Sequence, residues 1–178
     1  MSVRTPPPAY AELVARVDAF DARVQAAQGP YLRCAEGCDT CCRQRRTAFP
    51  VEVDAIRLWL SQATPALLET LRARRDDPEV RADRRCVYLN PEGRCDVYVA
   101  RPLLCRTHGP AIRSASLGLS FCGLNFEGMD AAAVDAAVPA DGILNLDLLT
   151  RMLVLIDAQH RAGTSLPARQ DLEEALTP

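Results

Sequence analysis

Lysine is absent from this chain, and all of its basic residues are arginines. The formal net charge is −2, which argues against a general nucleic-acid-binding role. A run of about 18 uncharged apolar residues, which a membrane-spanning helix requires, is also missing. The most apolar segment, residues 143–156, is interrupted by Asp147 and Arg151. We therefore expect neither a membrane nor a nucleic acid as the partner of this chain.

A secretory signal is the next feature that the sequence lacks. Such a signal needs an apolar run of about 7–15 residues after a basic start. Here Arg4 is followed by three prolines and then by Glu12, Arg16 and Asp18. We expect a cytoplasmic protein, in a reducing compartment where stable disulfides are rare and cysteine clusters bind metals or carry out redox chemistry.

Cysteine, in contrast, is plentiful. The chain has eight, and four of them fall within the nine residues 34–42. Cys41 and Cys42 are adjacent, and neighbouring cysteines bond to each other only with strain. Spacing and compartment together favour a metal or cluster site over structural disulfides or redox-active thiols.

Length and patterning indicate a mainly α fold. The 178 residues, 48% of them hydrophobic, suit a single domain with a real core. We predict a disordered proline-rich tail over residues 1–8 and one cysteine-cluster domain over residues 9–178. Helices are predicted over residues 9–28, from Pro50, after Thr64, from Asn145 to about Arg161 and over residues 171–176. A small β-hairpin is predicted over residues 86–99, so that helices and hairpin surround a cysteine-lined site.

The nature of the bound group is open between an iron–sulfur cluster and zinc. Thiolate is a soft ligand that suits both. Zinc ribbons supply paired C-x₂₋₄-C knuckles, and only one such group, Cys34/Cys38/Cys41, is present. The irregular later spacing and the Cys41-Cys42 pair favour a cluster, with [4Fe–4S] preferred and Zn²⁺ as the alternative. Eight cysteines could fill two four-ligand sites or one site with thiols left over.

The spacing C-x₃-C-x₂-C at Cys34, Cys38 and Cys41 also matches the motif of radical S-adenosylmethionine enzymes. Those enzymes use a partial α/β barrel, which needs about 200 residues of alternating strand and helix. The mostly helical pattern of this chain argues against that fold.

Two segments resemble a known family. CAEGCDTCCRQ is similar to the cysteine-cluster signature of the YkgJ-type zinc- or iron-chelating proteins, and GRCDVYVARPLLCRTHG is similar to their second signature. The resemblance covers roughly residues 30–125. It implies metal or cluster binding by all eight cysteines, namely Cys34, Cys38, Cys41, Cys42, Cys86, Cys95, Cys105 and Cys122. The similar motif of flagellin lysine methylases suggests S-adenosylmethionine-dependent methyl transfer as an alternative.

Two arginines flank Cys105 within the second signature. Because a thiolate site carries negative charge, Arg101 and Arg106 could offset that charge or tune a cluster potential. The alternative is an ordinary salt bridge to Asp96 or Glu92. Both interpretations stay open.

The two histidines are weaker candidates. His108 lies three residues after Cys105 and could serve as an additional ligand, although a hydrogen-bonded loop residue is the more common role. His160, near the end of the last long helix, is predicted to be a surface residue.

We expect a small cytosolic metal protein with an accessory, electron-transfer or metal-handling role. The sequence leaves open whether it is an enzyme, since no base–nucleophile set, P-loop, Rossmann fingerprint or H-E-x-x-H motif occurs. The alternatives are a cluster enzyme that transfers methyl groups and a structural-zinc module that binds a protein partner.

Overall fold

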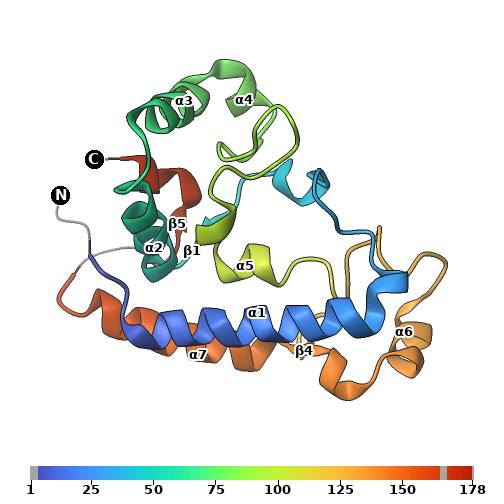
Figure 1. Ribbon diagram of the computed structural model, residues 1–178. Helices are drawn as coiled ribbons and strands as arrows, with labels where there is room; N and C mark the ends of the chain where they lie inside the picture. The colour runs from blue at the N-terminus through green and yellow to red at the C-terminus, as the bar shows by residue number, and fades with distance from the viewer. Residues whose placement is uncertain (1–3, 165–167, 178) are drawn as a thin grey trace. The chain divides into compact units, whose positions relative to one another are not determined.

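The computed structural model describes residues 4–164 and 168–177, and it is mainly helical, as predicted. The chain divides into two compact units. Figure 1 shows the helices and strands, coloured by residue number. Unit 1 comprises residues 1–7, 36–102 and 157–178, and unit 2 comprises residues 8–35 and 103–156. The predicted division into a tail over 1–8 and one domain over 9–178 stays a prediction, and residues 1–3 of that tail lie outside the described part.

Unit 1 is built from short helices with two-residue strands between them. Its elements are η2 (Thr40–Cys42), β1 (Thr47–Ala48), α2 (Pro50–Leu60), α3 (Pro65–Asp76), α4 (Pro78–Ala82), η3 (Tyr98–Ala100), β5 (Gln170–Asp171) and η5 (Leu172–Leu176). Strands β1 and β5 pair in antiparallel register, Thr47 with Asp171 and Ala48 with Gln170. The C-terminal segment is thereby fixed to the segment that follows the four-cysteine motif.

The starts of α2 and α3 confirm the helix signals in the sequence. Proline suits the first helical position because its fixed φ is already helical and its missing N–H has no partner there. At α2, the Glu52 carboxylate accepts a hydrogen bond from the Phe49 N–H at 2.9 Å. At α3, the Thr64 hydroxyl accepts from the Leu67 N–H at 3.3 Å.

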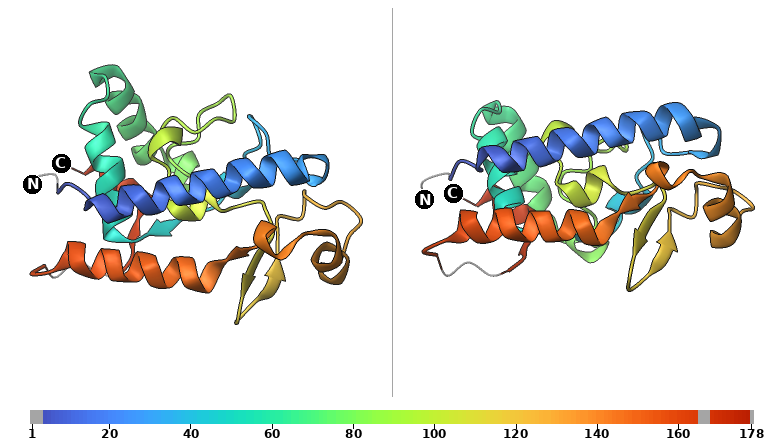
Figure 2. Two further views of the ribbon diagram at one scale, coloured as in Figure 1. Left: turned by 60° about the horizontal axis from the view of Figure 1, so that its bottom comes forward. Right: turned by 90° about the horizontal axis from the view of Figure 1, so that it is seen from below.

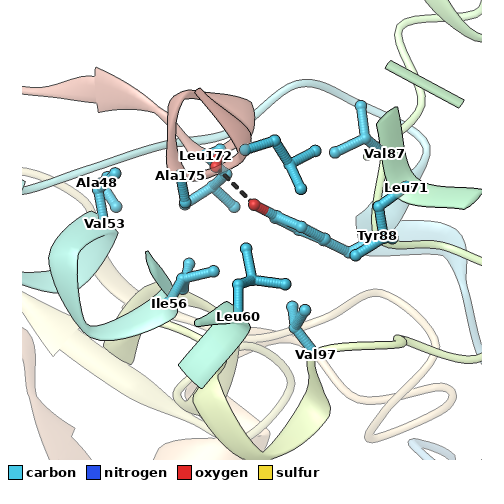
Figure 3. Close-up of a cluster of buried hydrophobic side chains, with 11 residues drawn as sticks. Ala48, Val53, Ile56, Leu60, Leu71, Val87, Tyr88, Val97, Leu172 and Ala175 are labelled. Carbon is cyan, nitrogen blue, oxygen red and sulfur yellow. Dashed lines mark hydrogen bonds between the residues drawn. The ribbon is translucent and has the colours of Figure 1, made fainter. Parts of the chain in front are cut away.

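The core of unit 1 joins α2, α3, the loop after Cys86 and η5. Figure 3 shows its buried side chains converging on Tyr88, whose hydroxyl donates to the Leu172 carbonyl at 2.9 Å. Burial raises the Tyr88 pKa, so this hydroxyl stays protonated and keeps its partner. The predicted helix over residues 171–176 is present as the 3₁₀ segment η5, which packs against α2.

The prediction that His160 lies on the surface is wrong. His160 is only 6% exposed, and its Nε2 lies 2.8 Å from the Asp54 carboxylate of α2. One turn earlier, buried Asp157 accepts the Val51 N–H at 3.0 Å and so satisfies a donor at the start of α2. Both residues belong to the end of α7 (Leu146–Arg161), whose residues 157–161 are part of unit 1. In the sequence, a polar residue in the last turn of a helix looks like a surface residue, because its partner on another element is not visible there.

The hairpin predicted over residues 86–99 is reduced to one isolated bridge between Leu89 and Cys95. The turn itself forms, since the Asn90 side chain accepts from the Arg94 N–H and donates to Asp96. The Asn90 N–H donates to the Arg94 carbonyl and the Asp96 N–H to the Tyr88 carbonyl, both at 2.8 Å, and beyond Asp96 the chain enters η3 instead of extending. The predicted hairpin is therefore present in a form shorter than residues 86–99.

Unit 2 contains the paired strands that form a real hairpin. Its elements are α1 (Pro8–Gln28), η1 (Gly29–Tyr31), α5 (Leu103–Arg106), β2 (Ile112–Ser114), β3 (Gly118–Ser120), α6 (Ala131–Ala137), η4 (Ala140–Gly142), β4 (Leu144–Asn145) and residues 146–156 of α7. Figure 2 shows β2 and β3 as two neighbouring arrows. They are antiparallel, and β2 also pairs in parallel with β4.

The helices of unit 2 begin where local signals place them. Helix α1 confirms the helix predicted over residues 9–28, and Asn145 caps α7 by accepting the Leu148 N–H at 2.9 Å. Phe126, Val134 and Val138 are buried in a second apolar cluster with Val24 of α1. Each unit thus has its own core.

Candidate metal centre

The eight cysteines all lie in the described part of the chain, and none forms a disulfide. All are half-buried. Unit 1 holds five of them, Cys38, Cys41, Cys42, Cys86 and Cys95, and unit 2 holds the other three, Cys34, Cys105 and Cys122. The division cuts through the four-cysteine motif, between Cys34 and Cys38.

The short segment η2 positions the adjacent pair Cys41 and Cys42. Its turn is closed by the Cys42 N–H, which donates to the Asp39 carbonyl at 2.7 Å. The two Sγ atoms are 3.9 Å apart. Two thiolates bound at about 2.3 Å to one tetrahedral ion are separated by about 3.8 Å, so this pair has the spacing of two ligands of a single ion.

The Cys41 thiol is the more acidic partner of this arrangement. Its pKa is lowered to about 6, chiefly by the hydrogen bond with Cys42, and the Arg46 charge lowers it further against the opposing effect of burial. The Arg46 guanidinium also donates to the Cys41 carbonyl, at 3.2 and 3.3 Å. A thiolate is therefore available at neutral pH, which is the form that binds metals.

Backbone contacts bring the second signature to this pair. The Cys86 N–H donates to the Cys42 carbonyl at 2.9 Å, and the bridge at Leu89 carries Cys95 back beside Cys86. Gly93 (φ +76°) completes the turn, where a Cβ atom would lie 3.2 Å from the Gly37 carbonyl oxygen. Glycine at this position thus lets the 90–93 turn approach the loop of the first signature.

Cys86 and Cys95 lie in an environment that resists a bare thiolate. Burial, aided by the negative charges of Cys95 and Cys41, raises the pKa of Cys86 to about 11, against the lowering effect of a hydrogen bond from the Tyr88 backbone. Burial also raises the pKa of Cys95, while the Arg101 charge lowers it. Since thiolates that repel one another become stable when a cation lies between them, this sulfur group suits a metal ion.

A small pocket beside Cys86 is lined by Arg45, Arg46 and Arg85, together with Asp171 and Glu173. Arg45 is paired with Glu173 at 2.9 Å. The pocket therefore combines positive side chains with acids that already neutralise part of their charge.

In unit 2, Cys34 and Cys122 are tied to the same residue, Gly109. A Cβ atom on Gly109 (φ +123°) would lie 2.8 Å from the Cys34 Sγ, and the Gly109 carbonyl accepts the Cys122 N–H at 3.1 Å. Cys105 lies on α5, and His108 is exposed. The sequence patterns singled out neither Gly109 nor Asn125, whose amide contacts it.

The two arginines of the second signature differ in their surroundings. Arg101 lies over the Tyr98 ring at 3.9 Å, in addition to its effect on Cys95. Arg106 pairs with Asp18 of α1 at 2.7 and 2.8 Å. Asp96, named as an alternative partner, pairs with Arg74 at 2.7 Å. A role for Arg101 and Arg106 near the bound group stays a prediction.

Within the described residues, no three side chains of histidine, cysteine, aspartate or glutamate are already arranged to hold an ion. The assignment of all eight cysteines as ligands therefore stays a prediction. The Cys41 and Cys42 sulfurs form a close pair at 3.9 Å. The donor set is nonetheless chemically suited to zinc or iron, because it is rich in soft thiolates.

A comparison with protein families identifies the family of this chain. Residues 33–123, just over half of its length, match the CxxCxxCC family, described as a "Putative zinc- or iron-chelating domain". The chain belongs to this family, as its two signatures predicted, and the match spans every cysteine from Cys34 to Cys122. Family membership supports metal binding by this chain. No curated protein and no solved structure gives a significant match.

Among the described helices, none combines the length and the apolarity that crossing a membrane requires.

Proposed function

We propose that this chain is a small cytoplasmic metal protein whose main centre lies in unit 1, with Cys41, Cys42, Cys86 and Cys95 as ligands. The observation that carries this proposal is the 3.9 Å separation of the Cys41 and Cys42 sulfurs, together with the half-buried thiols of Cys86 and Cys95, on both of which the Cys41 charge acts. Cys38 lies in the same unit and is the fifth candidate.

Electrostatics supports a cation at this position. The metal-free group contains one thiol that ionises easily and two that burial keeps protonated. A divalent ion stabilises all of these thiolates together and releases their protons, so that its binding free energy adds to the free energy of folding. The ion would supply charge neutralisation and a cross-link between the two signatures.

The spacing of the adjacent pair favours one zinc or iron ion over a cluster. In a [4Fe–4S] cluster, each cysteine binds a different iron, so the ligand sulfurs lie farther apart than two sulfurs on one ion. An iron–sulfur cluster is the second candidate, because unit 1 has one cysteine more than a single ion needs and the sequence spacing is irregular.

An accessory, electron-transfer or metal-handling role fits a chain whose recognisable chemistry consists of its sulfur ligands. Methyl transfer from S-adenosylmethionine and a structural-zinc module for a protein partner are the other functions in contention. Binding of S-adenosylmethionine by the loaded protein would favour methyl transfer.

Anaerobic purification followed by elemental analysis per chain tests the proposal. We expect zinc or iron at one or more ions per chain. A brown protein with broad visible absorption and acid-labile sulfide would establish the cluster instead of the single ion. A chain that binds neither zinc nor iron under any of these conditions would refute the proposal.

Two serine variants locate the centre. Cys86→Ser removes a proposed ligand, and we expect loss of the unit 1 metal. Cys38→Ser is the matched control from the same unit, and retention of the metal there would show that the fifth sulfur is dispensable. Equal retention in both variants would contradict the proposed ligand set.

A further inference from the structure

The amide of Asn125 in unit 2 contacts a cysteine sulfur. Asn125 is 1% exposed, and its side-chain nitrogen lies 3.6 Å from the Cys34 Sγ. The same nitrogen donates to the Gly109 carbonyl at 2.7 Å, and the side-chain oxygen accepts the Arg33 N–H at 2.8 Å. Each end of this amide therefore has a partner within the unit.

These partners determine which way the amide points. The Arg33 N–H can only donate, and the Gly109 carbonyl can only accept. The oxygen of Asn125 must therefore face Arg33, and the nitrogen must face Gly109 and Cys34. One amide hydrogen is directed to the carbonyl, which leaves the other for the sulfur.

The backbone around the sulfur leaves little freedom for any other arrangement. The Asn125 N–H donates to the Cys122 carbonyl at 2.9 Å, and the Cys122 N–H donates to the Gly109 carbonyl at 3.1 Å. Because a Cβ atom at Gly109 would approach the Cys34 Sγ to 2.8 Å, only glycine leaves the sulfur in its place. Segments far apart in the sequence thus converge on one thiol.

We propose that Asn125 is the positioning residue of Cys34: its side-chain N–H donates a hydrogen bond to the Cys34 sulfur and holds that sulfur in the orientation in which it binds metal. The inference goes beyond the proposed centre of unit 1, since it takes Cys34 of unit 2 as a further metal ligand. Hydrogen bonds to a ligating atom fix its orientation, and their loss typically weakens metal binding by about 10–100-fold.

The variant Asn125→Asp isolates the donor. It retains the oxygen that accepts from Arg33 and nearly the same shape, but it replaces the nitrogen with an oxygen that faces a carbonyl and a thiolate. Cobalt(II) serves as the probe ion, and its affinity is measured by competition with a chelator. The variant Cys34→Ser identifies which bound cobalt depends on Cys34. We expect Asn125→Asp to lower the affinity for that cobalt about 10–100-fold.

The double variant separates positioning from a general structural role. If Asn125 acts through the Cys34 sulfur, Asn125→Asp lowers the affinity in the native background and has no further effect in Cys34→Ser. An equal loss in both backgrounds would overturn the inference. Asn145→Asp is the matched control, because it makes the same change in unit 2 while keeping the oxygen that caps Leu148.

Failure of the inference is distinguishable from failure of the proposed function. A native chain that binds no cobalt, zinc or iron refutes the function. A native chain that binds metal as tightly as Cys34→Ser leaves the function standing and refutes the inference.

A measurement on the native chain covers the case in which Asn125→Asp does not fold. With ¹¹³Cd bound, a hydrogen bond from Asn125 to a metal-bound sulfur transmits scalar coupling from the amide proton to the metal. We expect this coupling in the NMR spectrum. Its absence, when the Cys34 β-protons do couple to ¹¹³Cd, would overturn the inference.

Discussion

The two units of this chain control their sulfur atoms by opposite physical means. In unit 1, Cys86 and Cys95 pack against the apolar cluster around Tyr88, and burial keeps their thiols protonated. In unit 2, the Cys34 sulfur lies against a buried amide and a glycine. Apolar surroundings raise the free energy of a thiolate unless a cation is bound. A hydrogen bond from an amide stabilises and orients a thiolate before any cation binds.

This difference predicts how the proposed centre of each unit would respond to a metal. We expect unit 1 to gain most from a bound ion itself, because an ion would remove the repulsion among its thiolates. Unit 2 depends more on geometry, because the contacts of Asn125 and Gly109 specify where the Cys34 sulfur lies. Three experiments can break or sharpen this comparison.

Removal of the metal should have the largest effect. A ligand that binds only the folded state stabilises it by about 4 kcal/mol when its free concentration is 1,000 times its Kd. We expect a strong chelator to unfold unit 1 or to destabilise it by at least that amount, as followed by circular dichroism. Hydrogen exchange should increase most over residues 86–100. An unchanged spectrum after complete metal removal would contradict the expectation.

Truncation of the unit 1 core should have the next largest effect. Leu71 is fully buried beside Val87 and Tyr88, and Leu71→Ala should lower the free energy of unfolding by about 2–5 kcal/mol. Urea denaturation measures the loss. The control is Leu155→Ala, the same change at a residue that is 72% exposed, for which we expect less than about 0.5 kcal/mol. Similar losses in both variants would show that Leu155 is covered by a partner.

Alkaline pH should produce the smallest effect, and only in the metal-free chain. The Cys86 pKa is raised from 9.0 to about 11 in the folded state. A pKa raised by folding contributes stability that is complete below pH 9 and is lost as the pH rises through 11, by at most about 2–3 kcal/mol. Tyr88, whose pKa is also raised by burial, acts with the same sign at higher pH.

Urea denaturation of the metal-free protein between pH 8 and pH 11 tests whether its stability falls as the pH rises. Cys86→Ala should flatten the decline, and bound metal should abolish it, because the metal-bound sulfur is already deprotonated. A metal-free chain whose stability rises over this interval would rule out the buried position of Cys86.

Features that depend on residues close together in the sequence were predicted correctly, whereas features that depend on distant residues were not. The helices at residues 9–28, after Phe49 and after Thr64 were predictable, because apolar spacing and capping operate within a few residues. The hairpin at residues 86–99 is shorter than predicted, since η3 ends the extended backbone after Cys95. The burial of His160 was also missed, because its partner Asp54 lies 106 positions earlier in the chain.

The sequence by itself determined the supply of donors: eight cysteines, six of them in two signatures, the family to which the chain belongs, and the soft metals that thiolates prefer. Only the tertiary structure decided that five of these sulfurs lie in one unit and three in the other, and that Asn125 contacts Cys34. Ligand chemistry is a property of each side chain. The grouping of ligands is different, because it depends on contacts between segments that sequence spacing does not specify.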